Sequence, residues 1–221
     1  HFTVVRFEKI EGAAIENHQW NSRHFERLGR LTGFMHRIGH EYSPPVEMSL
    51  LEWDRIPEAQ LARHLPNDDR GLPQLHKDVV AHMAAMQRRS DYYGPIHYDI
   101  HHGNYLMTPD GRLVLLDFES SCSGHYINDI AIVLYSARPH ELPSEDDFDR
   151  TFLTAFWRGY ETEHLIPEAE IRHIPWLLLY RSLMVYAFLV QLWPSEPHSE
   201  QATHLEKVET SIRNCIADLE Q

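Results

Sequence analysis

A short hairpin set among helices is the feature that most constrains how this chain can fold. Residues 105–107 and 113–116 are two apolar runs, joined by the turn Thr108-Pro109-Asp110-Gly111. Pro, Asp and Gly favour turns for local conformational reasons, so this segment predicts two short antiparallel strands. Elsewhere apolar residues recur every three or four positions, which predicts helices at about residues 22–39, 75–89, 127–137, 145–163, 168–193 and 200–219.

The order of these elements indicates an α+β fold that is mainly α. Residues 2–8 are rich in β-branched and aromatic side chains and predict one further strand. Residues 46–69 predict irregular structure with one short helix at most. The long apolar run at 174–193 is interrupted by polar residues, among them Arg181. We therefore expect a buried core helix there and no membrane span.

Charge and cysteine content exclude several classes of protein. Acidic residues outnumber Lys and Arg by 33 to 20, a net charge of −13, so we expect neither a nucleic-acid partner nor a membrane-surface partner. Cys122 and Cys215 are far apart and form no CxxC pair, which argues against a disulfide framework and a zinc site. With no signal-peptide pattern at the amino terminus, we expect a cytoplasmic location.

Three oxygen-bearing side chains around the hairpin have the chemistry needed for phosphoryl transfer. That reaction needs a carboxylate to orient the attacking hydroxyl and accept its proton, and oxygen ligands for Mg²⁺ beside the nucleotide phosphates. Asp99 fits the first requirement, and Asn104 follows it by five residues. Asp117 ends the second predicted strand, so the turn should bring it back beside Asn104. Magnesium prefers oxygen ligands of this kind.

The same segment resembles a known family. His97-x-Asp99, then Asn104, then Leu-Leu-Asp117 is similar to the catalytic loop and metal-binding Asp of small-molecule kinases with the protein-kinase-like fold. Asn128-Asp129-Ile130-Ala131 resembles a later element of these kinases. The resemblance is strongest over residues 94–135 and points to the aminoglycoside phosphotransferase, choline kinase and homoserine kinase type II-like family.

The resemblance implies a role for each matched position. Asp99 would be the catalytic base, and His97 would orient the loop. Magnesium would be held by Asn104 and Asp117. Asp129 would brace the catalytic loop and cap the helix that it begins, and Glu119 would be either a carboxylate facing the metal or a residue that only ends the strand.

The resemblance also implies a nucleotide site and a domain arrangement. Leu106 and Leu116 would floor the adenine pocket, with the backbone near Glu8 and Ile10 along the adenine edge. Residues 1–12 would form a hinge strand and linker, and residues 13–221 a helical carboxyl-terminal lobe. Within that lobe, residues 97–119 would form the catalytic loop and hairpin, and the helices at 145–219 would bind the acceptor.

The sequence has no initiator Met, no glycine-rich phosphate loop and no Lys on a strand before the hinge. Because a kinase needs such a Lys and usually such a loop, we expect the amino-terminal lobe to be absent from this chain. We then expect weak nucleotide binding and little or no turnover from these 221 residues alone.

The predicted function is transfer of the γ-phosphate of ATP, with Mg²⁺, to a hydroxyl of a small molecule such as an aminoglycoside, an amino alcohol or a homoserine-like compound. One alternative is a kinase-like binding module without catalysis. Another is a metallohydrolase that uses His97, His101 and His102 as ligands.

Overall fold

The computed structural model describes residues 6, 8–15, 20–43, 45, 49–138, 145–193 and 198–220, with the backbone alone at 145–147. These residues form six α-helices, two 3-10 helices and four short strands. In chain order they are α1 (Ser22–Glu41), η3 (Pro57–His64), α2 (Leu72–Ala85), β1 (Tyr93–Ile96), β2 (Tyr105–Met107), β3 (Leu113–Leu115), β4 (Cys122–His125), α3 (Tyr126–Ala137), α4 (Glu145–Tyr160), η4 (Glu168–His173), α5 (Ile174–Leu192) and α6 (Ser199–Leu219).

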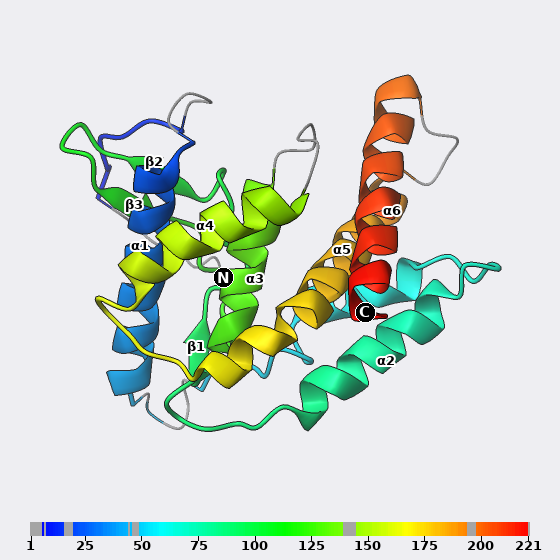
Figure 1. The fold of residues 1–221 in the computed structure, drawn as a ribbon, viewed down its shortest axis with the longest axis horizontal. Helices are drawn as coiled ribbons and strands as arrows, with labels where there is room; N and C mark the ends of the chain where they lie inside the picture. The colour runs from blue at the N-terminus through cyan, green and yellow to red at the C-terminus, as the bar shows by residue number, and fades with distance from the viewer. Residues whose placement is uncertain are drawn as a thin grey trace.

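Helices α1 and α4 cross at close range on one side of the molecule (Figure 1). The Asn21 side chain caps α1 by accepting hydrogen bonds from the backbone N–H groups of Arg23 and His24. Gly29 on α1 and Gly159 on α4 permit the crossing. A methyl group added at Gly159 would lie 1.8 Å from the Glu26 carbonyl oxygen, so the two backbones approach more closely than any other residue would allow.

The strands form two small antiparallel sheets that present the loop between them. Strands β2 and β3 pair with Tyr105 opposite Leu115, and Gly111 in their turn has φ 81°, the left-handed conformation that glycine favours. The predicted hairpin is therefore confirmed. Strands β1 and β4 pair with Ile96 opposite Cys122. Residues 97–104 thus form the loop that connects β1 in one sheet to β2 in the other.

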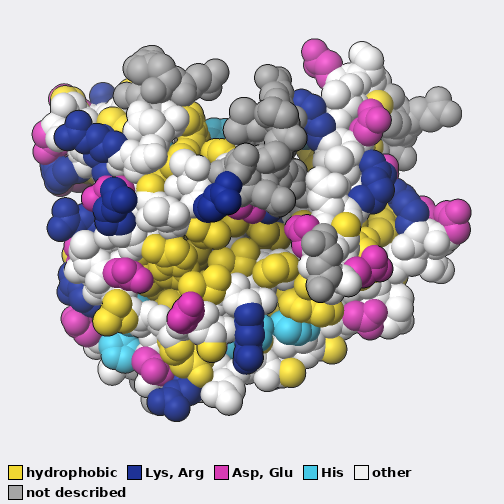
Figure 2. All heavy atoms as spheres, viewed as in Figure 1, with side chains coloured by type: hydrophobic (Ala, Val, Ile, Leu, Met, Phe, Trp, Pro, Cys, Tyr) yellow, Lys and Arg dark blue, Asp and Glu magenta, His cyan; other side chains and the backbone are white. Residues whose placement is uncertain are grey.

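Helix α5 runs through the interior, with α6 beside it (Figure 1). Residues Glu168–Leu192 are long and apolar enough to cross a membrane, but 67% of the apolar window is buried inside the protein. The prediction of a buried core helix is confirmed. On the face shown in Figure 2, apolar side chains gather over the region of α3, α4 and α5, and charged side chains lie around its edge.

Several boundaries differ from the predictions. The segment at 168–193 is not one helix, because η4 occupies its start and α5 begins only at Ile174, just before Pro175. The sheet formed by β1 and β4 was not predicted. The short helix expected within residues 46–69 is η3. Most of the strand predicted at residues 2–8 lies outside the described residues.

Candidate active site

A buried carboxylate on α3 fixes the start of the loop between β1 and β2. Asp129 Oδ2 accepts the backbone N–H of His97 at 2.9 Å, and Oδ1 accepts that of Tyr98 at 2.8 Å. His36 Nε2 on α1 lies 3.3 Å from Oδ2 as a third donor. The expectation that Asp129 also caps α3 was wrong, because its carboxylate is used by the loop and the N-cap residue is His125.

Tyr98 has an unusual backbone conformation that these contacts hold in place. Its φ of 69° is left-handed, which costs a non-glycine residue about 1–3 kcal/mol unless the surroundings fix it. Its N–H is held by Asp129, and its hydroxyl donates to the Tyr180 hydroxyl on α5 at 2.9 Å. The loop is therefore anchored from α3 on one side and from α5 on the other.

His97 ties the loop to the end of the hairpin. Its Nε2 lies 2.8 Å from the Leu116 carbonyl oxygen, which can only accept, so Nε2 carries the proton. The other ring nitrogen, Nδ1, accepts the backbone N–H of Asp99 at 3.3 Å. Both nitrogens of this buried ring are occupied, so His97 is not available as a metal ligand. Among the described residues, no group of three or more His, Cys, Asp or Glu could hold a metal ion, which counts against the metallohydrolase alternative.

Asp99 is the one carboxylate in the loop at residues 97–104, and three side chains contact it. Arg181 Nη2 donates to its Oδ1 at 2.6 Å, while Asn104 Nδ2 and His101 Nε2 lie 3.2 Å and 3.4 Å from Oδ2. Burial by itself would raise the pKa of Asp99, but the hydrogen bond from His101 and the charge of Arg181 hold that pKa well below its usual range. Asp99 is therefore ionised at neutral pH.

Asn104 pairs through its backbone with Leu116, the residue before Asp117. Asn104 donates its side-chain Nδ2 to Asp99, which turns its Oδ1 away from that contact, and its backbone oxygen accepts the Leu116 N–H at 2.8 Å. Asp117 follows directly, with φ 59° and an exposed side chain. Within the described part of the chain, its carboxylate has no hydrogen bond or ion pair.

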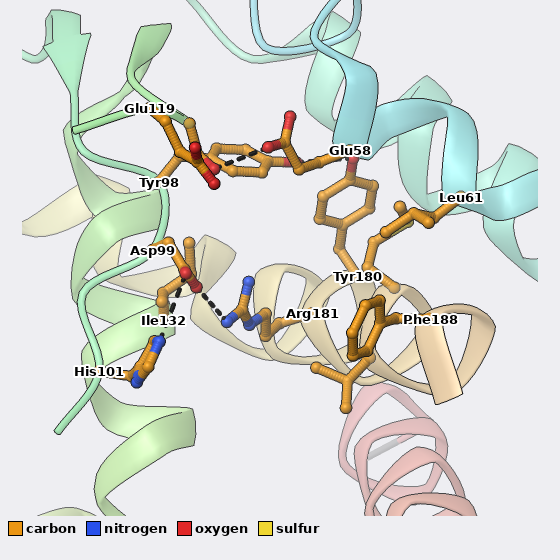
Figure 3. A pocket seen from close by; sticks show the side chains of 13 residues that line it. Glu58, Leu61, Tyr98, Asp99, His101, Glu119, Ile132, Tyr180, Arg181 and Phe188 are labelled. Carbon is orange, nitrogen blue, oxygen red and sulfur yellow. Dashed lines mark hydrogen bonds and ion pairs between the residues drawn. The ribbon is translucent and has the colours of Figure 1, made fainter. Parts of the chain in front are cut away.

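A pocket of about 440 Å³ opens beside Asp99. In Figure 3, Asp99 and Arg181 face each other on one side of it, and Glu58 and Glu119 line its upper part. Glu58 Oε1 accepts the Ser120 hydroxyl at 2.7 Å, whereas its buried Oε2 has no partner among the described residues. Apolar and aromatic side chains complete the wall, namely Leu61, Tyr98, Ile132, Tyr180, Met184, Val185 and Phe188. The pocket thus offers a carboxylate beside space for a small molecule.

The comparisons agree with this geometry. A model of the phosphotransferase enzyme family matches residues 2–172. The chain belongs to this family. It is 30% identical over 197 residues to amicoumacin kinase of Bacillus subtilis (strain 168), which covers 87% of this chain and 58% of that protein. It is also 28% identical over 182 residues to homoserine kinase of Methylobacterium sp. (strain 4-46), covering 79% of this chain and 54% of that protein.

Solved structures of kinases share the fold. The amicoumacin kinase hAmiN, in complex with AMP-PNP, Ca²⁺ and Ami, superposes with a TM-score of 0.83 at 26% identity, covering 94% of this chain and 63% of that one. The microcompartment-associated aminopropanol kinase superposes with a TM-score of 0.73 at 19% identity, covering 97% and 67%. The mainly helical, protein-kinase-like fold expected from the sequence is confirmed. The chain spans little more than half the length of the curated relatives it matches.

The residues that the family resemblance links to the nucleotide lie around the hairpin. Gly12 packs so closely on β2 that an added methyl group would meet Leu106 Cβ at 3.0 Å. Ala13 and Met107 exchange two backbone hydrogen bonds of 2.9 Å, which bring the preceding segment beside β2. Leu116 is half-buried, and Glu8 and Ile10 in that segment are exposed.

Sequence reasoning missed two pocket residues of this family member, Arg181 and Glu58. Arg181 is the only charged residue in α5, and that isolation is a signal from which a role could have been inferred. Glu58 lies on η3, in a segment with no pattern that marks it. Glu119, which the sequence left open, lines the pocket beside Glu58.

Proposed function

We propose that this chain forms the acceptor-binding lobe of a kinase that transfers the γ-phosphate of ATP to a hydroxyl of a small molecule. The observation that carries this proposal is the position of Asp99. Its carboxylate borders the pocket and also contacts Asn104. An acceptor in the pocket and nucleotide phosphates near Asn104 could therefore both lie next to Asp99. Membership of the phosphotransferase family supports the same reaction class.

In the proposed reaction the acceptor hydroxyl hydrogen-bonds to Asp99 from within the pocket. The ionised carboxylate orients the hydroxyl oxygen toward the γ-phosphorus and takes its proton as the new P–O bond forms. The bond between the γ-phosphorus and the bridging oxygen of the β-phosphate breaks in the same step, and ADP leaves with that oxygen. His97 keeps the loop in position by bridging Asp99 and Leu116. The aromatic and apolar wall excludes water, which would otherwise compete as the phosphate acceptor.

Asn104 and Asp117 fit the requirements of a Mg²⁺ site. The Asn104 Oδ1 is not used in the contact with Asp99, and the Asp117 carboxylate has no ionic partner among the described residues. Both are hard oxygen donors, and Mg²⁺ bound with nucleotide phosphates needs only one or two protein oxygens. When bound, the ion would neutralise charge on the phosphates. The amicoumacin kinase complex with AMP-PNP and Ca²⁺ supports nucleotide and divalent-ion binding by a protein of this fold.

The proposal also assigns residues to a nucleotide-binding site. Leu106 and Leu116 floor the adenine pocket, and the backbone near Glu8 and Ile10 lines its edge. The Lys and the glycine-rich loop that hold ATP phosphates in kinases would come from outside these 221 residues, as the greater length of the relatives suggests. We place the reaction in the cytoplasm, where ATP is available.

The test uses the protein made from the complete reading frame. It is incubated with ATP, Mg²⁺ and panels of amino alcohols, aminoglycosides and hydroxy amino acids, and ADP release is measured. We expect one class to stimulate ADP release. Asp99→Asn should lower the turnover rate by about 10²- to 10⁴-fold, while the exposed control Asp91→Asn should leave it unchanged. An active Asp99→Asn enzyme would contradict the role of Asp99.

Nucleotide binding tests the metal assignment separately. Asp117→Ala should abolish the Mg²⁺-dependent part of ATP binding, measured by calorimetry with and without Mg²⁺. Unchanged Mg²⁺ dependence would mean that Asp117 is not a ligand. If ATP and an acceptor both bind but no ADP forms, the chain is the non-catalytic binding module.

A further inference from the structure

Arg181 is an unusual residue for the helix that carries it. Helix α5 is apolar through most of its length, and Arg181 is its only charged residue. The Arg181 side chain is only 20% exposed. Removing a guanidinium from water is costly unless a partner compensates. A fold that needed only packing at this position would be served as well by Met or Leu, so the charge calls for a specific explanation.

The contacts of Arg181 point to the catalytic loop. Its Nη2 donates to Asp99 Oδ1 at 2.6 Å, which is the shortest contact of that carboxylate. The neighbouring residue on α5, Tyr180, binds the neighbouring residue on the loop, Tyr98. Two consecutive residues of α5 therefore hold two consecutive residues of the loop, and α5 also supplies much of the pocket wall.

The geometry leaves the two carboxylate oxygens of Asp99 unequal. Oδ1 is held at 2.6 Å by a charged donor, whereas the contacts of Oδ2 with Asn104 and His101 are longer, at 3.2 Å and 3.4 Å. A shorter, charge-assisted contact is the stronger one. Oδ1 therefore fixes the direction of the carboxylate, and Oδ2 is the oxygen that can exchange a partner for an incoming hydroxyl.

We propose that Arg181 is a positioning residue for the phosphotransfer reaction, fixing Asp99 through Oδ1 so that Oδ2 is presented to the acceptor hydroxyl. This inference rests on the proposed function. Arg181 acts through Asp99, and among the described residues it forms no hydrogen bond or ion pair with Asn104 or Asp117.

A purely structural ion pair is the competing explanation, and the chain offers a matched control for it. Arg138 Nη2 pairs with Asp149 Oδ2 at 2.5 Å, and its side chain is 9% exposed. This pair joins α3 to α4 and contains no loop residue. Replacing Arg138 with Met therefore reports what the loss of a buried Arg–Asp pair does to the protein in general.

The experiment measures kcat, the KM for ATP and thermal stability in the complete protein. The variants are Arg181→Met, Arg181→Lys and Arg138→Met. Misaligned reacting groups cost about 10²-fold, so we expect Arg181→Met to lower kcat by about 10- to 100-fold with an unchanged KM for ATP. Arg181→Lys keeps the charge and should recover part of that loss. Arg138→Met should affect thermal stability but leave kcat near that of the unsubstituted protein.

The outcomes separate the two proposals. An unsubstituted protein with no kinase activity contradicts both the proposed function and this inference. An active protein whose kcat changes by less than about twofold in Arg181→Met contradicts this inference alone. The same holds if Lys recovers nothing, or if Arg138→Met lowers kcat equally. Should Arg181→Met not fold, Arg181→Gln, which keeps hydrogen-bond donors, is judged by the same limits on kcat and KM.

Discussion

The sharpest prediction concerns Asp129, whose carboxylate is fully buried. It accepts hydrogen bonds from the backbone N–H groups of His97 and Tyr98 and from the ring of His36. The substitution Asp129→Asn keeps the shape of the side chain but replaces one acceptor oxygen with an NH₂ group. One of the two backbone N–H groups then faces a donor in place of an acceptor, whichever way the amide is turned.

The expected cost follows from these contacts. A buried N–H left without an acceptor costs about 1–3 kcal/mol, and the other two donors lose a charged acceptor at about 1 kcal/mol each. Asp129→Asn should therefore lower the free energy of unfolding by about 3–5 kcal/mol, a large part of the 5–15 kcal/mol typical of folded proteins. The left-handed backbone of Tyr98 also loses the acceptor that holds it.

Urea denaturation of the 221-residue chain, followed by tryptophan fluorescence, measures this change. Asp91→Asn is the control, because the Asp91 ion pair with Arg89 is exposed and such pairs contribute about 0–1 kcal/mol. A loss below about 1 kcal/mol in Asp129→Asn would refute the reasoning. It would mean that solvent or a moved side chain replaces the missing acceptor.

Two further predictions concern stability. Burial, assisted by a nearby arginine, lowers the pKa of His24 and of His125 to about 4 from an ordinary 6.5, so the unfolded chain binds these protons first as the pH falls. The free energy of unfolding should be highest above pH 6.5 and should fall by about 2 kcal/mol per histidine between pH 7 and pH 5. Urea denaturation midpoints measured across this pH range test the prediction, and midpoints that do not change with pH would contradict it. Gly159→Ala should push α4 away from α1, because the added Cβ would lie 1.8 Å from the Glu26 carbonyl oxygen. Overpacking of this kind lowers the free energy of unfolding by about 1–3 kcal/mol or more. A melting temperature equal to that of the unsubstituted chain would contradict this prediction.

Local sequence signals predicted the parts of the fold that are determined locally. The β2–β3 hairpin depends on its own turn residues, and Gly111 adopts the conformation expected of it. Helix α1 begins where Asn21 can cap it and continues with apolar spacing. The spacing of Asp99 and Asn104 marked both as candidates for one site, and the structure brings their side chains into contact.

Contacts between distant parts of the chain could not be predicted in this way. Strand β1 contains Gly94 and Pro95, and its partner β4 contains Ser123 and Gly124, so neither carries a β pattern. They become strands because the tertiary fold brings them together. The contact between Arg181 and Asp99 spans 82 positions, and only the folded structure shows that the single charge of α5 has its partner in the loop.

Different parts of the candidate site hold the loop and form the pocket wall, and this bears on the proposed choice of acceptor. The loop at residues 97–104 is held mainly by backbone groups, through Asp129 and through the carbonyl oxygen of Leu116. The pocket wall is built from side chains of α5 and η3, such as Phe188 and Leu61. Side chains on a helix surface can change size or polarity while the backbone stays in place. Under the proposed function, the acceptor can therefore change through substitutions on these two elements while the loop geometry is kept. Tyr180 and Arg181 are exceptions, because their side chains line the pocket and also hold the loop.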